Sequence, residues 1–192
     1  MLSRPQNHMR GNGGFTLIEL LIAVAVLAIM LALGVPAMST FLGNSSIRTN
    51  AEAIANGIQF ARTEAVRRNA NVRIVLDASG TSYTVNLASD GSVLNQRAAE
   101  GRADSVTVTP TPAGATTLTF TALGALTTNA DASAAITTIK VNGNTANAAQ
   151  LRNMCIMVSA GGIARMCDPL RTDVTDPQRC QPAVDTDCVP TP

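Results

Sequence analysis

The stretch "GGFTLIELLIAVAVLAIMLALGVPAM", from Gly13 to Met38, decides the fold of this chain. Between Phe15 and Ala37 it contains 23 residues, of which only Glu19 is charged. At about 1.5 Å per residue, an α-helix of this length crosses the roughly 30 Å hydrocarbon core of a bilayer. The stretch therefore predicts a transmembrane helix.

The residues before the apolar run predict its orientation. They carry Arg4, Arg10 and the amino terminus, with no acid, and the positive-inside bias places such a flank in the cytoplasm. A secretory signal peptide is the alternative, because "LGVPA" has the small residues of a cleavage site. The hydrophobic region of a signal peptide usually has about 7–15 residues, however, and this run is longer and contains a carboxylate.

The composition limits what the rest of the chain can be. The 192 residues suit one modest domain plus an additional segment. Only 3% of them are aromatic and none is Trp, so small aliphatic side chains must form the core. Lys and Arg (14) nearly balance Asp and Glu (13), so bulk charge indicates neither nucleic acid nor an anionic membrane as a partner.

The helix is expected to continue beyond the membrane. Apolar residues recur there at alternating gaps of four and three, which is the spacing of one helix face. These residues are Ile47, Ala51, Ile54, Ile58, Ala61 and Ala65. A helix from Phe15 to about Asn69 would be roughly 80 Å long, so its first half should protrude from the domain. The stripe covers under three heptads and is rich in Ala, which favours packing on the chain's own sheet over a coiled coil.

A break in this helix is expected at Gly34 and Pro36. Proline removes one backbone hydrogen bond and clashes with the preceding turn. We therefore expect a bend or local melting at this point.

Beyond Asn71 the pattern changes to short β-rich stretches separated by Gly, Asn, Asp and Pro. The expected strands are 72–76, 82–87, 105–109, 116–122, 135–141, 152–159 and 163–167. The expected turns are 77–80, 89–91, 142–143 and 161–162. Together they predict an antiparallel sheet against one helix, with the register of 111–129 left open.

The four cysteines lie in the last 40 or so residues: Cys155, Cys167, Cys180 and Cys188. An even number in a loop-rich tail favours disulfides in an oxidising compartment. Metal ligation is the alternative. It needs closely spaced cysteines or a histidine, and the single histidine, His8, precedes the apolar run.

Four cysteines allow three pairings, and the register of a hairpin bears on the choice. A three-residue turn at 160–162 sets Cys155 opposite Cys167, whereas a two-residue turn does not. Only the first register allows a direct cross-strand bridge. We expect that bridge, with Cys180 and Cys188 closing a small loop of their own, while the other two pairings stay open.

The segment "GFTLIELL", after a short basic leader that ends at Gly14, resembles the class III signal of type IV pilins and of the pseudopilins of type II secretion. The resemblance implies that a prepilin peptidase cuts between Gly14 and Phe15, and that Phe15 is then N-methylated. A second segment, "IQFARTEAVRRNANVRIVL" at 58–76, is similar to the one that leaves the long helix in the FimT/GspH-type branch of minor pilins and pseudopilins.

This resemblance implies an α+β pilin fold. A long N-terminal α-helix, transmembrane in its first half, would pack on an antiparallel β-sheet, and the C-terminal tail would be disulfide-bonded. The parts would be a cleaved basic leader at 1–14, a transmembrane helix at 15–37, the amphipathic periplasmic half of the same helix at 38–70, and a β-rich globular domain at 71–192.

Glu19 has a specific expected role. Cleavage before Phe15 would create a positively charged amine at the start of the same helix. Glu19 lies one helical turn from that amine and faces the positive end of the helix dipole. In the family's assembly model the amine belongs to a neighbouring subunit, so the pair would set the register between two membrane helices. Glu19 is therefore expected to be an assembly residue, and a tolerated acid with no partner is the alternative.

The residues give no support for catalysis. Loss of His8 with the leader would leave no histidine, which excludes Ser-His-Asp and Cys-His schemes and histidine metal sites. Neither a G-x-S-x-G nor a P-loop motif is present. Asp173 and Asp176, or Asp185 and Asp187, could imitate an acid/base or Ca²⁺ site, but solvated loop acids are the simpler interpretation. We expect no catalytic residue, cofactor or metal.

Three functions of different classes remain. The first is a minor pilin that enters or primes a type IV pilus, or the similar pseudopilin of a type II secretion system. Its partners would be the prepilin peptidase/N-methyltransferase, other major and minor pilins, the inner-membrane assembly platform and, before assembly, membrane lipid. It would cross the bacterial inner membrane once, with its C-terminal domain periplasmic, and then enter the filament. Another function is that of a membrane-anchored periplasmic domain that joins no filament, but such a domain would not require the peptidase motif.

The remaining function is DNA binding, because some FimT-type minor pilins take up DNA through a C-terminal G-R-x-R hairpin. The matching stretch here runs from Gly162 to Arg165, and Ile163 replaces the first arginine. Arg165 and Arg152 are the candidate contacts to phosphate. Structural ion pairs with nearby acids are the alternative, and the acids are Asp168, Asp173 and Asp176.

Overall fold

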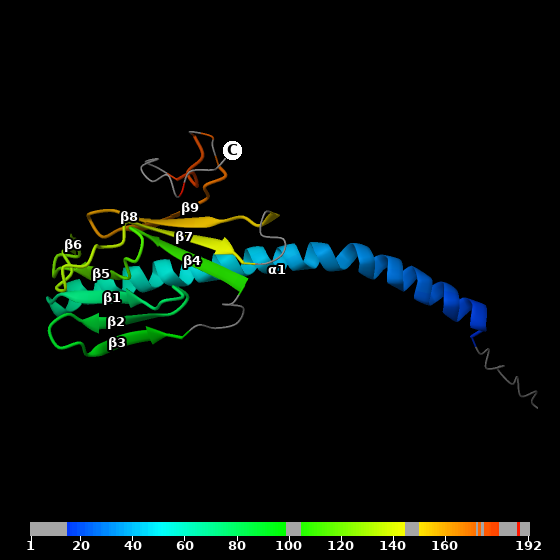
Figure 1. The fold of residues 1–192 in the computed structure, drawn as a ribbon, viewed down its shortest axis with the longest axis horizontal. Coiled ribbons are helices and arrows are strands. Elements are labelled where there is room, and N and C mark those ends of the chain that lie inside the picture. The colour runs from blue at the N-terminus through cyan, green and yellow to red at the C-terminus, as the bar shows by residue number, and fades with distance from the viewer. Residues whose placement is uncertain are drawn as a thin grey trace, which may run out of the picture. The chain divides into compact units, whose positions relative to one another are not determined.

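The structure is a computed structural model that describes residues 15–98, 105–144, 150–171, 173, 175–180 and 188. Within this part a long helix, α1, is followed by nine strands (Figure 1). The chain divides into two compact units, Met1–Ser39 and Thr40–Pro192. The elements are α1 (Leu17–Arg68), β1 (Val72–Leu76), β2 (Tyr83–Leu87), β3 (Val93–Arg97), β4 (Val106–Thr111), β5 (Thr117–Phe120), β6 (Leu126–Thr127), β7 (Thr138–Gly143), β8 (Met154–Val158) and β9 (Ala164–Cys167).

Helix α1 is continuous from Leu17 to Arg68. Of the bend or local melting expected at Gly34 and Pro36, the melting is wrong, because both residues are helical. The bend stays a prediction. One proline removes a single donor from the hydrogen-bond ladder, and the strong helix formers Leu, Ala and Met on either side keep the rest of it. The helix ends where Asn69 takes a left-handed conformation, φ 50°, and the Ala70 N–H bonds back to the Ala65 carbonyl.

The apolar stripe of α1 is buried as its spacing predicts. All six of its residues, from Ile47 to Ala65, have an exposed fraction of 0%. They form one cluster with inward side chains of both sheets, among them Ile74, Phe120 and Ile156. The expected packing of this half of the helix on the chain's own strands is thus confirmed.

The strands form two sheets instead of the single sheet expected from sequence. One has the order β3-β2-β1-β5-β6 and the other β4-β7-β8-β9. Every strand pair in both sheets is antiparallel. Inward apolar residues of both sheets form one buried cluster with the helix stripe.

Seven of the strands lie where the sequence predicts them, with shifts at their ends, and two were missed. Strand β3 is an exposed edge strand without apolar alternation, and β6 has only two residues. The expected turn at 142–143 is also wrong, because Asn142 and Gly143 pair with β4. The Asn-Gly pair is a turn signal only where no neighbouring strand competes for its backbone groups.

The β8–β9 hairpin has the register that the sequence analysis favours. The Ser159 N–H donates to the Ile163 carbonyl at 3.0 Å, which encloses a three-residue turn. Gly162 closes this turn with a φ of 77° that favours glycine. Cys155 consequently lies opposite Cys167.

All four cysteines form disulfides, but the expected pairing is wrong. The bridges are Cys155–Cys188 and Cys167–Cys180. Opposite residues in antiparallel strands alternate between hydrogen-bonded and non-hydrogen-bonded pairs, and the Cα atoms lie farther apart in the hydrogen-bonded kind. The Ser159–Ile163 pair is hydrogen-bonded. By this alternation Cys155 and Cys167 also form a pair of the hydrogen-bonded kind. Their side chains point to the same side of the sheet, where the four cysteines make one buried cluster. The cysteine of each strand therefore forms its disulfide with a tail cysteine and not with the cysteine of the neighbouring strand.

Peptide mapping of the oxidised, unreduced chain tests this pairing. We expect fragments that join Cys155 to Cys188 and Cys167 to Cys180, because each pair has a Cα–Cα distance within bridging range, 6.2 Å and 4.9 Å. Mapping after denaturation at low pH prevents exchange between thiols and disulfides. A fragment that joins Cys155 to Cys167 would contradict the structure and restore the cross-strand bridge.

Glu64 makes the last turns of α1 sensitive to pH. Arg67 and Arg68 each donate to its carboxylate at 2.7 Å. Hydrogen bonds from Arg67, and then from Arg68, lower the pKa of Glu64 to about 2. Since the folded pKa lies below the unfolded one, this carboxylate stabilises the fold at neutral pH and loses its contribution as the pH falls toward 2.

A Glu64→Gln variant measures this contribution. We expect its urea midpoint to lie below that of the parent at pH 7, and the difference to shrink as the pH falls through the acid range. A Glu52→Gln variant, the same substitution at an exposed ion pair of the same helix, is the control. A difference between Glu64→Gln and parent that does not change with pH would contradict the role of the carboxylate.

Candidate functional site

The start of α1 contains the residues that the sequence analysis assigns to processing and assembly. Phe15 and Thr16 precede the helix, and Gly14 lies outside the described residues. The Glu19 N–H donates to Thr16 Oγ1 at 3.3 Å, so Thr16 is the N-cap residue. Glu19 is exposed in the first helical turn, where its charge is favourable to the helix dipole.

The cap is a feature that the sequence analysis missed. Thr16 and Glu19 have the T-x-x-E spacing of a capping box, so the signal was available in the sequence. Because of the cap, Phe15 lies outside the helix, with 86% of its surface exposed. The bond between Gly14 and Phe15 thus directly precedes the capped helix.

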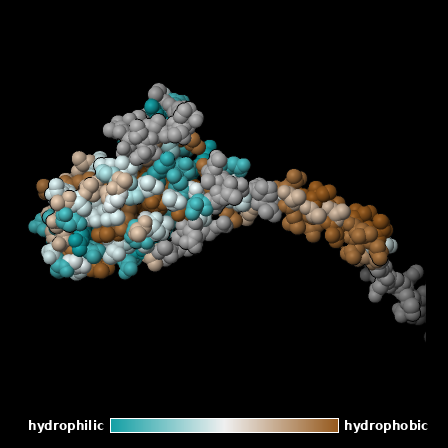
Figure 2. Space-filling view, in the orientation of Figure 1, coloured by the Kyte–Doolittle hydropathy of each residue, from teal (hydrophilic) through white to brown (hydrophobic). Residues whose placement is uncertain are grey.

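The first half of α1 presents apolar side chains on every face. From Leu17 to Leu33 its large hydrophobic residues are all exposed, and Figure 2 shows this segment as a nearly unbroken hydrophobic surface. Within the described residues, α1 is the one helix long and apolar enough to cross a membrane. Exposure of such a surface to water is unfavourable, so lipid or other apolar segments are expected to cover it.

The second candidate region is the C-terminal tail, where Asp168 organises several basic groups. Asp168 is buried, and its Oδ1 accepts a hydrogen bond from the Leu170 N–H at 2.9 Å. Its Oδ2 lies 3.8 Å from Arg152 Nη1 and 3.7 Å from Arg171 Nε. Arg171 also pairs with Asp176 at 2.6 Å. This pairing raises the pKa of Arg171 and lowers the pKa of Asp176.

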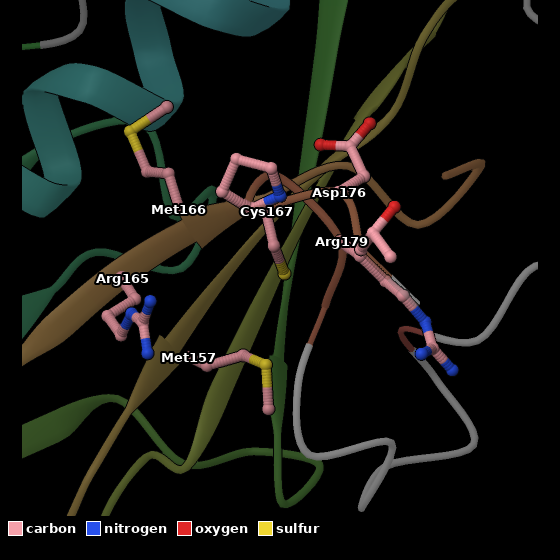
Figure 3. A pocket seen from close by; sticks show the side chains of 8 residues that line it. Met157, Arg165, Met166, Cys167, Asp176 and Arg179 are labelled. Atoms are coloured by element: carbon pink, nitrogen blue, oxygen red, sulfur yellow. The ribbon is translucent and has the colours of Figure 1, made fainter. Parts of the chain in front are cut away.

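Arg165 lies apart from that cluster. It is exposed on β9, opposite Met157 of β8, and lines a cavity of about 240 Å³ with Arg179. Figure 3 shows the two arginines on different sides of this cavity, with Met157 and Cys167 between them. Arg152 lines another cavity, of about 450 Å³, between α1 and the tail. The two cavities share Met166 and Cys167, and each of them is lined by one of these two arginines.

The acids of the tail have structural partners. Asp173 accepts hydrogen bonds from the N–H and the hydroxyl of Thr175, which lower its pKa, and Asp176 pairs with Arg171. Asp185 and Asp187 lie outside the described residues. In the part of the chain that the structure describes, no group of three His, Cys, Asp or Glu residues could hold a metal ion.

Comparison with solved structures finds similar chains of low sequence identity. The type IV minor pilin FimU of Pseudomonas aeruginosa is 20% identical, with a TM-score of 0.48, and the match covers 66% of this chain and 91% of FimU. The minor pseudopilin EpsH of the type 2 secretion system of Vibrio cholerae is 12% identical, with a TM-score of 0.46, and the match covers 65% of this chain and 98% of EpsH. No curated protein matches the chain significantly.

Family models give the decisive comparison. The prokaryotic N-terminal methylation motif matches residues 9–35, which include the start of α1. The model of the type II transport protein GspH matches residues 50–162, which is more than half of the chain and extends from the buried half of α1 to the β8–β9 turn. The chain belongs to the GspH family and carries the prokaryotic N-terminal methylation motif.

Proposed function

We propose that the chain is a minor pilin, a structural subunit that enters or primes a type IV pilus. One combination carries this proposal: a methylation motif and a GspH domain are joined in one chain by a single helix whose first half is wholly apolar and exposed. A plain membrane anchor would need the apolar segment but neither the motif nor an acid in the first turn of the helix.

The proposed path has two stages. Before assembly, residues 15–37 span the inner membrane, with the leader 1–14 in the cytoplasm and the domain from residue 38 onward in the periplasm. After the leader is removed, the same apolar surface leaves lipid and packs against the helices of other pilins. Both environments are apolar, so the transfer costs little hydrophobic free energy.

Glu19 supplies the specificity that apolar packing lacks. Placing a carboxylate within a membrane-spanning segment costs free energy unless a charged or hydrogen-bonding group pairs with it. The amine that cleavage creates at Phe15 is such a partner when it belongs to an adjacent subunit. The proposed pair fixes the axial register between two helices, which otherwise slide over uniform apolar surfaces.

A pseudopilin of a type II secretion system is the alternative, because the helix chemistry is the same in both systems. The disulfide-bonded tail favours the pilus. To distinguish them, sheared surface filaments are analysed by mass spectrometry, and protein export is measured in a strain that lacks this chain. Recovery in pili with normal export supports the proposal, whereas loss of export without loss of pili supports the pseudopilin.

An enzyme or a DNA-binding module has less support. The tail acids are held by Arg171 and by turn hydrogen bonds, and Arg152 lies beside the buried Asp168. Arg165 alone is a weak phosphate contact, because DNA affinity grows with the number of phosphates that a surface neutralises.

Mass spectrometry of the chain purified from membranes tests processing. We expect a mature N-terminus at an N-methylated Phe15, because the cap at Thr16 leaves the preceding bond outside the helix. In cells without the prepilin peptidase the leader should stay attached. An N-terminus at Met38 would instead indicate an ordinary signal peptide.

A Glu19→Ala variant tests the assembly role. We expect its amount in sheared filaments to fall about tenfold relative to the parent, because the helix loses its charged partner in an apolar setting. Its amount in the membrane should be unchanged. A Thr16→Ser variant, which keeps a capping hydroxyl, is the control. Equal incorporation of Glu19→Ala and parent would show that the carboxylate has no part in assembly.

A further inference from the structure

Three large apolar side chains are exposed at the end of the domain where α1 terminates. Val66 of α1 is 53% exposed, Leu123 of the β5–β6 turn is 88% exposed, and Ile163 of the β8–β9 hairpin is 48% exposed. We call these three residues the apolar end patch. They come from segments that are far apart in the sequence, so no local pattern explains their common exposure.

Gly124 is the point where the three segments meet. A Cβ atom on Gly124 would lie 3.1 Å from Val66 Cγ2. A Cβ atom on Gly162, next to Ile163, would collide with the Gly124 carbonyl oxygen. The two turns are also joined by a hydrogen bond from the Leu126 N–H to the Ala160 carbonyl at 3.1 Å.

Arg62 fixes this arrangement further, because its Nε–H donates to the Gly124 carbonyl at 2.9 Å. Both turns are thus held to the helix end and to each other by close backbone contacts. The apolar end patch is therefore preorganised, and a partner would bind it without first ordering loops.

The surroundings of the patch indicate the chemistry of its partner. The adjacent turn residues are small and uncharged, and they are Thr121, Ala122, Ala125, Ala160 and Gly161. The charges near the patch are mainly basic: on the last turns of α1, Arg62, Arg67 and Arg68 outnumber the acid Glu64, and Arg165 is exposed on β9 two residues after Ile163. An apolar centre with arginines at its rim is typical of protein interfaces. Aliphatic side chains offer nothing to the phosphates of a nucleic acid.

We propose that the apolar end patch is the docking surface for the globular domain of another filament subunit, which presents apolar side chains bordered by at least one carboxylate. This inference rests on the proposed function. In that function the apolar first half of α1 is covered by lipid or by neighbouring helices. The apolar end patch belongs to the compact unit Thr40–Pro192, and we assign it to a contact between domains. Its basic rim selects an acidic border on the partner by charge complementarity.

Photocrosslinking in the full-length chain in cells tests the contact. A benzophenone amino acid replaces Leu123, which is exposed enough to tolerate it, and Leu170 is the control position, since it is also apolar and exposed, at 57%, but lies in the tail. We expect position 123 to crosslink to a protein that itself carries a prepilin-type N-terminal motif, and position 170 not to. A crosslink to DNA, to a protein without that motif, or to nothing would overturn the proposal.

Charge substitutions at Leu123 test the chemistry of the partner. We expect Leu123→Asp to lower recovery in sheared filaments about tenfold, and Leu123→Lys to lower it much less, because the carboxylate on the partner repels the first and attracts the second. Leu170→Asp is the matched control. Each variant must keep the parent's amount in the membrane and its thermal midpoint of unfolding. We expect this result because Leu123 is exposed, and substitutions at exposed positions change stability little.

The outcomes separate this inference from the proposed function. If the parent chain is absent from filaments, the proposed function fails. If the parent and Leu123→Asp enter filaments equally, only the docking surface fails. If Leu123→Lys is the more damaging substitution, the acidic border on the partner is wrong.

Discussion

Burial of one helix stripe against the inward residues of two sheets is the interaction on which the rest of the domain depends. The six stripe residues of α1 have no exposed surface, and they contact inward side chains from both sheets. With few aromatic side chains in the chain, this close packing of Ile, Val and Ala supplies most of the hydrophobic stabilisation. The same helix leaves its first half uncovered, so one element is both the core of a folded domain and an apolar surface that needs another environment.

The tail depends on this core through the sheet. Strands β8 and β9 place Ile156 and Met166 toward the core and Cys155 and Cys167 toward the opposite side. Each of these cysteines bonds a tail cysteine, and the buried Asp168 adds hydrogen bonds at the edge of β9. The tail has few apolar residues of its own. Its conformation is therefore set by covalent and polar links to a sheet that α1 stabilises.

The distribution of charge and exposure favours assembly over chemistry. Acids and arginines in the tail are used in ion pairs and turns, whereas the first half of α1 and the apolar end patch expose large apolar side chains. Polar groups that pair with one another have few free hydrogen bonds or charges to offer a substrate. Exposed apolar groups on a rigid frame are features of a subunit that is completed by its neighbours.

The sequence by itself determined the features that rest on local periodicity and turn chemistry. The spacing from Ile47 to Ala65 predicted the buried face of α1, because helical geometry acts over a few residues. The Gly-Gly turn limited the hairpin of β8 and β9 to two registers, and the correct one was preferred for a cross-strand bridge that the structure does not contain. The tertiary structure alone decided the division into two sheets and the disulfide pairing. These depend on which strands, tail residues and side chains meet after the chain has folded around α1, and contacts between distant segments leave no periodic signal in the sequence. The continuity of α1 through Pro36 also went against the local rule, because the helix formers on both sides outweigh one missing hydrogen bond.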